Sequence, residues 1–259
     1  MSADLPPPQA VVLRSRVIPA RFAHGFSTRI GGVSPPPFDA LNLGRKWGDA
    51  PDNVAENRRR FLAAVGAPER LYVARQIHGA RVVEVRAGDD ARALADVEAD
   101  GLVSAAPGIT LGVFVADCIP ALIADPRTGL VAAVHAGWRG TLAGVLPAAV
   151  AALVERGARA SDLRVALGPA IGACCFEVGA DVAARFDADL VRPSPSAKPD
   201  KRHVDLKAAN RRLLERAGVT PASIDAGPDC THHDRARFFS FRRDGSATGQ
   251  MMGVIATPG

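Results

Sequence analysis

Aromatic side chains are scarce in this sequence, which has ten Phe, two Trp and one Tyr among its 259 residues. RNA-recognition modules stack bases on aromatic side chains beside basic residues, and no motif of that kind occurs here. The 32 Lys and Arg against 27 Asp and Glu give a net charge of +5, but the basic residues are spread along the chain rather than gathered in runs. We therefore expect no nucleic-acid partner.

Long apolar runs are also missing, since no stretch of about 18 uninterrupted apolar residues, the length that spans a membrane, occurs in the sequence. The first ten residues, MSADLPPPQA, lack the basic and apolar regions of a secretion signal. We expect a cytoplasmic protein without a membrane partner and with a flexible, Pro-rich lead over residues 1–9. Cysteine is limited to Cys118, Cys174, Cys175 and Cys230, and the adjacent pair together with the missing signal favours reduced thiols.

The overall composition is that of a globular protein, with 47% hydrophobic and 23% charged residues. These values exclude wholesale disorder, collagen-like repeats and disulfide scaffolds. A chain of this length fits one large core, so we predict a single domain over residues 1–259.

Helical and strand patterns alternate along the chain, which predicts an α/β fold. Amphipathic patterns predict helices over residues 49–65, 141–157 and 204–218. Residues 109–118 and 130–137 are nearly continuous apolar runs, as expected of strands buried on both faces. The sequence ADPRTG between them predicts a tight turn, so the two strands should be neighbours and should bring Cys118 and His135 together.

Three potential metal ligands lie at predicted strand ends beside Gly or Pro: His78, Cys118 and His135. Two imidazoles and a thiolate form the ligand set of a catalytic zinc whose fourth position is open, although their spacing matches no short zinc motif. Two alternatives remain open. Cys118 is either a small core residue, or the nucleophile of a metal-free pair in which His135 lowers its pKa and the substrate is an acyl or amide group.

Short blocks distributed in order along nearly the whole chain carry a family resemblance. They are HGFSTRIGGVS, LNLG, QIHG, ADCIPAL, HAGWRG, GPAIGACCFEVG and CTHHDRARFFSFRRDGSATG. Together they resemble the YfiH-type family, known as multicopper polyphenol oxidase (laccase-like) or peptidoglycan editing factor. The sequence departs from the family pattern at Phe176 and Phe241, where Tyr is expected, and at Gln250, where Arg is expected.

The resemblance implies a four-layer α/β/β/α sandwich with mixed sheets and a zinc site on His78, Cys118 and His135. It also implies purine nucleoside phosphorylase activity on adenosine and inosine, with adenosine deaminase and methylthioadenosine phosphorylase activities. A nucleoside and phosphate would then be the partners, whereas copper-dependent phenol oxidation and peptidoglycan editing belong to other members. The oligomeric state, monomer or homodimer, stays open.

Phosphorolysis needs an anion pocket, and arginine forks are suited to bind phosphate. The arginines beside the Gly-rich turns and the matching blocks are the candidates, and polar residues of the same blocks complete the predicted substrate site: Arg29, Asn42, Arg75, Gln76, Arg139, Cys175 and Glu177. For Cys174 and Cys175 the sequence indicates no partners for a second metal, so we predict that Cys175 lines the site. Phe238, Phe239 and Phe241 are either stacking residues or core residues.

Deamination would need a metal-activated hydroxide and a carboxylate that transfers protons. Asp117 qualifies if the strand has ended by Ala116, and Glu177 is the other candidate. The predicted catalytic set is therefore Cys118, His135 and Asp117.

Copper is an alternative metal, but a laccase needs many histidines and the chain has six in total. Two functions of different classes therefore remain: a zinc-dependent nucleoside phosphorylase, and a Cys-His amidohydrolase or editing factor that acts on cell-wall precursors.

Overall fold

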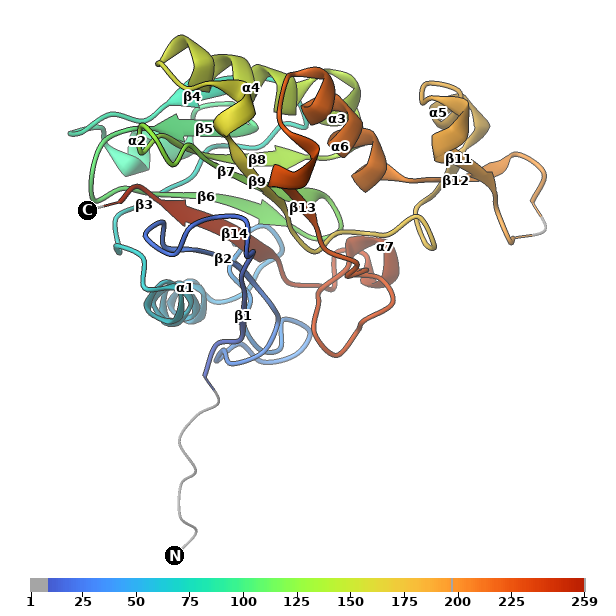
Figure 1. Cartoon of the computed structure of the whole chain (residues 1–259). Coiled ribbons are helices and arrows are strands. Elements are labelled where there is room, and N and C mark those ends of the chain that lie inside the picture. The colour runs from blue at the N-terminus through green and yellow to red at the C-terminus, as the bar shows by residue number, and fades with distance from the viewer. Residues whose placement is uncertain (1–8, 197, 259) are drawn as a thin grey trace, which may run out of the picture.

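Two large sheets pack face to face and form the centre of the molecule (Figure 1). The computed structural model describes residues 9–196 and 198–258, so the predicted flexible lead lies outside the described residues except for residue 9. The six-stranded sheet has the order β13-β9-β7-β8-β5-β4 and consists of Ile224–Ala226, Arg164–Leu167, Ile119–Ala124, Val131–Ala136, Gly101–Ser104 and Val82–Glu84. The five-stranded sheet has the order β1-β2-β14-β6-β3 and consists of Val12–Leu13, His24–Ser27, Met251–Ala256, Thr110–Val115 and Leu71–Tyr72.

Helices cover the outer face of each sheet. Above the six-stranded sheet lie α3 (Trp138–Leu142), α4 (Val145–Glu155) and α6 (Leu206–Arg216), and below the five-stranded sheet lies α1 (Pro51–Val65) (Figure 1). Both sheets are mixed, because β3 pairs with β6 and β4 with β5 in parallel while β7 and β8 are antiparallel. The predicted four-layer α/β/β/α sandwich with mixed sheets is therefore confirmed.

A small third sheet projects from one side of the sandwich (Figure 1). Its order is β10-β12-β11, with bounds Glu177–Gly179, Lys201–Val204 and Val191–Pro193. The remaining short helices are α2 (Ala91–Ala95), α5 (Ala180–Ala183), α7 (Phe241–Asp244) and the 3-10 turns Ala160–Asp162, Ala188–Leu190 and Pro221–Ser223. In the described part of the chain, no helix is both long and apolar enough to cross a membrane.

The central strands are buried on both faces, as their continuous apolar sequence predicts. In β7, Ile119, Ala121 and Ile123 face the helices, while Leu122 and Ala124 face the other sheet. This alternation follows from the two-residue period of a strand. The inter-sheet layer and the helix–sheet layer therefore use opposite faces of the same strands.

The three predicted helices differ from the observed ones in their bounds, and the helix predicted over residues 204–218 is shorter by two residues at each end. The helix predicted over residues 49–65 begins at Pro51, whose fixed φ suits a first helical position, while the Asp49 side chain accepts hydrogen bonds from Ser34 and Asn42 instead of capping. The helix predicted over residues 141–157 is divided, because Gly144 has a φ of +80° and separates α3 from α4.

The prediction that the apolar runs over residues 109–118 and 130–137 are neighbouring strands is wrong, because β6 (Thr110–Val115) lies in the five-stranded sheet and β8 in the six-stranded sheet. The strand that pairs with β8 is β7, and the predicted turn over residues 125–129 joins these two strands. Leu130 and Gly129 close it with Asp125, and Pro120 lies opposite His135 in the antiparallel register. Cys118, which immediately precedes β7, and His135, near the end of β8, thus reach the same edge of the six-stranded sheet.

Candidate active site

The three predicted metal ligands meet at that edge. One side-chain ligand atom from each of His78, Cys118 and His135 lies within 4.8 Å of the others. The two imidazole rings are 4.8 Å apart between centroids and meet edge to face. His78 comes from the loop between β3 and β4, where it has a φ of +61°, a conformation that non-Gly residues seldom adopt.

A buried carboxylate that our sequence reasoning missed holds this loop and the site together. Asp100 precedes β5, and its Oδ1 accepts hydrogen bonds from His135 Nδ1 (2.7 Å) and the backbone N–H of His78 (2.9 Å). Its Oδ2 accepts from the backbone N–H groups of Ile77 (3.1 Å) and Gly79 (2.7 Å). Asp100 therefore fixes the unusual loop backbone and leaves His135 Nε2 as the ring nitrogen available to a ligand. A polar residue directly before an apolar strand was the signal for it in the sequence.

The charges of these groups support one another. Burial raises the pKa of Cys118, but the charge of His135 and hydrogen bonds from His135 and His78 outweigh it and lower this pKa to about 6. Burial likewise lowers the pKa of His135, but the Cys118 thiolate and Asp100 raise it to about 9. For Asp100, burial raises the pKa, and the hydrogen bonds from His135 and Gly79 bring it below its usual value. A thiolate is the form of cysteine that binds a metal or acts as a nucleophile.

Gly137 allows the backbone to pass directly beside the ligand atoms. A Cβ at this position would lie 2.8 Å from His78 Nδ1 and 3.0 Å from Cys118 Sγ. Its φ of −76° and ψ of 171° are open to any residue, so space, not backbone conformation, requires glycine here.

The three side chains line a cavity of about 550 Å³. This volume is within the range of small-molecule sites. Four cationic side chains line the same cavity: Lys46, Arg75, Arg139 and Arg242. Among the described residues that line the cavity, Asp117 is the one acidic residue, so the cavity is suited to an anion.

The predicted residues Arg75, Gln76 and Arg139 all line this cavity. Arg75 forms an ion pair with Glu98 (2.9 Å), and the Gln76 amide exchanges two hydrogen bonds of 2.8 Å with the backbone of Phe114. Arg139 is exposed and packs over the Trp138 ring (4.3 Å), and no ion pair with another described residue holds its guanidinium. Arg139 is therefore the arginine of this group whose hydrogen-bond donors are most available.

Asp117 also lines the cavity, but both of its carboxylate oxygens already accept hydrogen bonds. Oδ1 accepts from Thr231 Oγ1 and Oδ2 from the Arg242 backbone N–H, each at 2.6 Å. Strand β6 ends at Val115, so the condition set for its catalytic role is met, and its φ of +87° turns it out of the strand direction. Its contacts connect the loop between β6 and β7, which contains Cys118, to the C-terminal segment.

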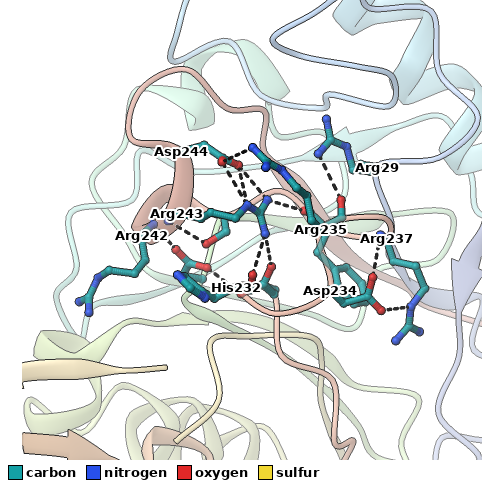
Figure 2. A network of polar contacts seen from close by, with 12 residues as sticks. Arg29, His232, Asp234, Arg235, Arg237, Arg242, Arg243 and Asp244 are labelled. Atoms are coloured by element: carbon teal, nitrogen blue, oxygen red, sulfur yellow. Dashed lines mark hydrogen bonds and ion pairs between the residues drawn. The ribbon is translucent and has the colours of Figure 1, made fainter. Parts of the chain in front are cut away.

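Two other predicted substrate residues lie outside the cavity. The Arg29 guanidinium forms an ion pair with Asp39 (3.0 Å) and packs over the Phe239 ring (4.6 Å), within a polar network of the C-terminal segment (Figure 2). Asn42 is buried, and its side chain bonds Asp49 and the backbone of Gly44 and Gln250. Both residues organise loops around the site, and their positions do not support direct substrate contact.

Cys175 and Glu177 are not among the cavity-lining residues either. Glu177 begins β10, and its carboxylate accepts hydrogen bonds from Ser194 and Ser196, which follow β11. Cys175 lies instead beside two other thiols, those of Cys174 and Cys230. The expectation that no partners exist for a second metal was therefore wrong, because chain folding brings distant residues to the Cys174–Cys175 pair.

Aromatic rings contribute to one wall of the cavity. Trp47 and Phe241 stack with centroids 5.6 Å apart, and Phe241 is 51% exposed. Phe238 and Phe239 are fully buried, so of the three candidate stacking residues Phe241 alone is available to a ligand. Sequence reasoning also missed Lys46 and Trp47, which lie in a turn, and Arg242, which lies in the short helix α7.

The fold and the site together define a four-layer α/β/β/α protein with a two-histidine, one-cysteine candidate metal centre at a sheet edge. The chain belongs to the family described as multi-copper polyphenol oxidoreductase laccase, whose model matches residues 23–258. This confirms the resemblance to YfiH proteins.

Individual proteins agree with this assignment. The chain is 42% identical over 236 residues to a purine nucleoside phosphorylase of Deinococcus radiodurans, which covers 91% of this chain and 89% of that protein. The crystal structure of Bacillus licheniformis YfiH superposes with a TM-score of 0.87 at 32% identity and covers 96% of this chain and 97% of that one. For YlmD of Geobacillus stearothermophilus the TM-score is 0.86 at 35% identity, with 96% of each chain covered.

Proposed function

We propose that this protein is a zinc-dependent purine nucleoside phosphorylase that acts on adenosine and inosine. One observation carries the proposal: His78, Cys118 and His135 open into a cavity with four cationic side chains and a single acid that is already hydrogen bonded. Several relatives that are 40–42% identical to the chain, including the Deinococcus protein, are named purine nucleoside phosphorylase.

The donor set fits a zinc ion. Two imidazoles and a thiolate leave one of four positions open, which is the arrangement of catalytic zinc sites. The Asp100 carboxylate binds His135 Nδ1, the ring nitrogen that would not bind the metal. Gly137 leaves room beside these atoms that a side chain would fill. When bound there, zinc would supply a Lewis acid to a substrate atom in the cavity.

The cationic residues fit inorganic phosphate. Arg139 presents an exposed guanidinium, and Arg242 donates to the Glu177 carbonyl with one nitrogen and packs over the Phe176 ring (5.5 Å). Planar guanidinium groups bind phosphate through paired hydrogen bonds. These two arginines would hold the nucleophilic phosphate and stabilise charge as the glycosidic bond breaks.

The exposed face of Phe241, with Trp47 behind it, offers a planar apolar surface to a purine ring. Methylthioadenosine has the same purine and would use the same surface. Deamination is the weaker part of the proposal, because it needs a carboxylate free to transfer protons and both Asp117 oxygens are already occupied.

The test is adenosine turnover with and without phosphate, measured together with metal content. We expect phosphate-dependent release of adenine and of ribose 1-phosphate by wild type, and loss of both with Cys118→Ala. Arg159→Ala, which changes an exposed arginine outside the cavity, serves as the control and should behave as wild type. Adenine release that is independent of phosphate would contradict phosphorolysis.

A second candidate has a specific observation in its favour. Cys118, His135 and Asp100 are arranged as nucleophile, base and orienting carboxylate, the arrangement of a cysteine hydrolase. A Cys-His amidohydrolase that edits cell-wall precursors would work without metal and without phosphate. Hydrolysis of amide substrates by metal-stripped protein, abolished in Cys118→Ser, would favour this function over the first.

Copper-dependent phenol oxidation has the least support. Two of the remaining histidines bond backbone carbonyls: His24 with Phe22 and Ser15, and His203 with Ala173. They are therefore engaged in the fold and do not extend the two-histidine centre toward the many-histidine set of a laccase.

A further inference from the structure

A second group of metal-binding side chains lies outside the active-site cavity. One ligand atom from each of Cys174, Cys175, Cys230 and His233 lies within 4.8 Å of all the others. The four residues come from two turns that are distant in sequence. The turns are brought together by a parallel bridge between Ala170 and Cys230.

The separation of one pair of ligand atoms matches that of a tetrahedral site. Cys174 Sγ and His233 Nδ1 are 3.5 Å apart. Ligands bound tetrahedrally to one zinc ion, with Zn–S near 2.3 Å and Zn–N near 2.0–2.1 Å, would be roughly 3.6 Å apart. The four cysteines of the chain are free thiols, so none of these sulfur atoms is used in a disulfide.

The surrounding backbone is adapted to the sulfur atoms. The Gly172 N–H donates to Cys230 Sγ at 3.2 Å. A Cβ on Gly172 would lie 3.2 Å from Cys174 Sγ and 3.3 Å from Cys230 Cβ, so a side chain there would crowd both cysteines. Hydrogen bonds from N–H groups to sulfur and close approach of the backbone orient thiolate ligands, although these groups do not bind the metal themselves.

From these observations we infer that Cys174, Cys175, Cys230 and His233 bind a structural zinc ion. Three thiolates and one imidazole complete a tetrahedral set, which is the closed type of zinc site, and soft thiolates select zinc over magnesium or calcium. The candidate centre at His78, Cys118 and His135 has three ligands and borders a cavity, so the two sites differ in both composition and role. This inference does not depend on the proposed phosphorylase activity.

The position of the cluster explains what such an ion would do. Ile171 and Phe176 flank the first turn and line the active-site cavity. Thr231 follows Cys230 and donates to Asp117, and further along the same segment Arg242 lines the cavity. The zinc ion would therefore fasten two walls of the cavity to each other, in addition to the polar network that Arg243 forms with the backbone of this segment (Figure 2).

The experiment counts zinc per chain by mass spectrometry after reconstitution under reducing conditions and removal of loosely bound metal. We expect two zinc ions in wild type, one in Cys118→Ala, one in Cys174→Ser and none in the double variant. Cys174 and His233 are exposed, so Cys174→Ser and His233→Asn should fold even if Cys230→Ser does not. His232→Asn is the matched control, since this neighbouring histidine is not part of the cluster, and it should keep both ions.

X-ray absorption at the zinc edge identifies the ligands directly. Cys118→Ala should retain one zinc ion surrounded by about three sulfur atoms at roughly 2.3 Å and one nitrogen. A folded Cys118→Ala protein that retains no zinc after reconstitution would overturn the inference. The inference would also be overturned if Cys174→Ser and His233→Asn each bound as much zinc per chain as wild type. Neither result depends on catalytic activity, so failure of this site and failure of the proposed function are distinguishable.

Discussion

Asp100 is the residue whose replacement tests the site most directly. Its carboxylate accepts four hydrogen bonds, three from backbone N–H groups of the loop that contains His78 and one from His135. Asp100→Asn preserves its shape and turns one acceptor oxygen into a donor. If the new amide nitrogen takes the Oδ2 position, the N–H groups of Ile77 and Gly79 both lose their acceptor. If it takes the Oδ1 position, the N–H of His78 loses its acceptor, and His135 Nδ1 keeps its hydrogen bond only by accepting from the amide, so one donor is left unpaired. The second orientation is therefore favoured.

The size of the effect follows from that geometry. Loss of one hydrogen bond to a charged, buried acceptor lowers the free energy of unfolding by about 1.5–3 kcal/mol. The amide would now donate to His135 Nδ1, which places the ring proton on Nε2 and removes the lone pair that a metal needs. Since changes to groups that orient metal ligands weaken binding about 10–100-fold, zinc affinity should fall by at least that factor, or roughly 1.4–2.7 kcal/mol.

Zinc affinity is measured by competition with a chelator, and stability by urea unfolding, both in a Cys174→Ser background so that the second cluster does not contribute. Asp125→Asn is the matched control: Asp125 is also fully buried and accepts from Arg127 N and Thr128 Oγ1, but at the opposite end of the β7–β8 pair. We expect it to lose similar stability and to keep its zinc affinity. If Asp100→Asn binds zinc as tightly as Asp125→Asn, the carboxylate does not control the site and the reasoning is refuted.

Three further predictions concern the same site. Gly137→Ala should fold but weaken zinc binding about 10-fold or more, because its methyl group would lie 2.8 Å from His78 Nδ1. Gly227→Ala, whose methyl group would have its nearest atom 3.9 Å away, should bind zinc as wild type does. Equal chelator-competition curves for the two variants would contradict this prediction. Arg139→Ala should raise the KM for phosphate about 10-fold or more with a smaller change in the KM for adenosine, and initial rates at varied phosphate would exclude the role if both KM values were unchanged. In the metal-free protein the pKa of Cys118 is lowered to about 6, which gives stability that is present above its ordinary pKa and is lost as the pH falls through about 6. The pKa of His135 is raised to about 9, which gives stability that is lost as the pH rises through about 9. Urea unfolding of metal-free wild type against Cys118→Ala should therefore differ most between about pH 6 and 9, and a difference that does not change with pH would argue against the ion pair.

The sequence by itself indicated the α/β class and the three candidate metal ligands, whereas the four layers were implied by the family resemblance. The apolar run over residues 109–118 forms β6 in the five-stranded sheet, whereas the Asp125–Gly129 turn joins the following strand, β7, to β8 in antiparallel pairing. That pairing places Cys118 and His135 at one sheet edge whatever the rest of the chain does. Their identification therefore depended on local pattern, which a single sequence contains.

The surrounding site was decided by tertiary structure, because its members are joined by contacts between segments that no local period links. Asp100 reaches His78 and His135 from the start of a third strand, and Arg242 reaches the cavity from the C-terminal segment. Arg29 carried the expected residue type beside a Gly-rich turn, yet its loop packs against the C-terminal segment and pairs it with Asp39.

The cysteine pair shows the same division. Cys174 and Cys175 are adjacent in the sequence, but Cys230 and His233 lie more than fifty residues further along. Tertiary contacts such as the Ala170–Cys230 bridge bring the four candidate ligand atoms within 4.8 Å of one another. Sequence spacing fixes which groups are neighbours along a strand or turn. Which loops meet at the end of the sandwich is fixed by how the two sheets and their helices bury their apolar faces, and that depends on the whole chain at once.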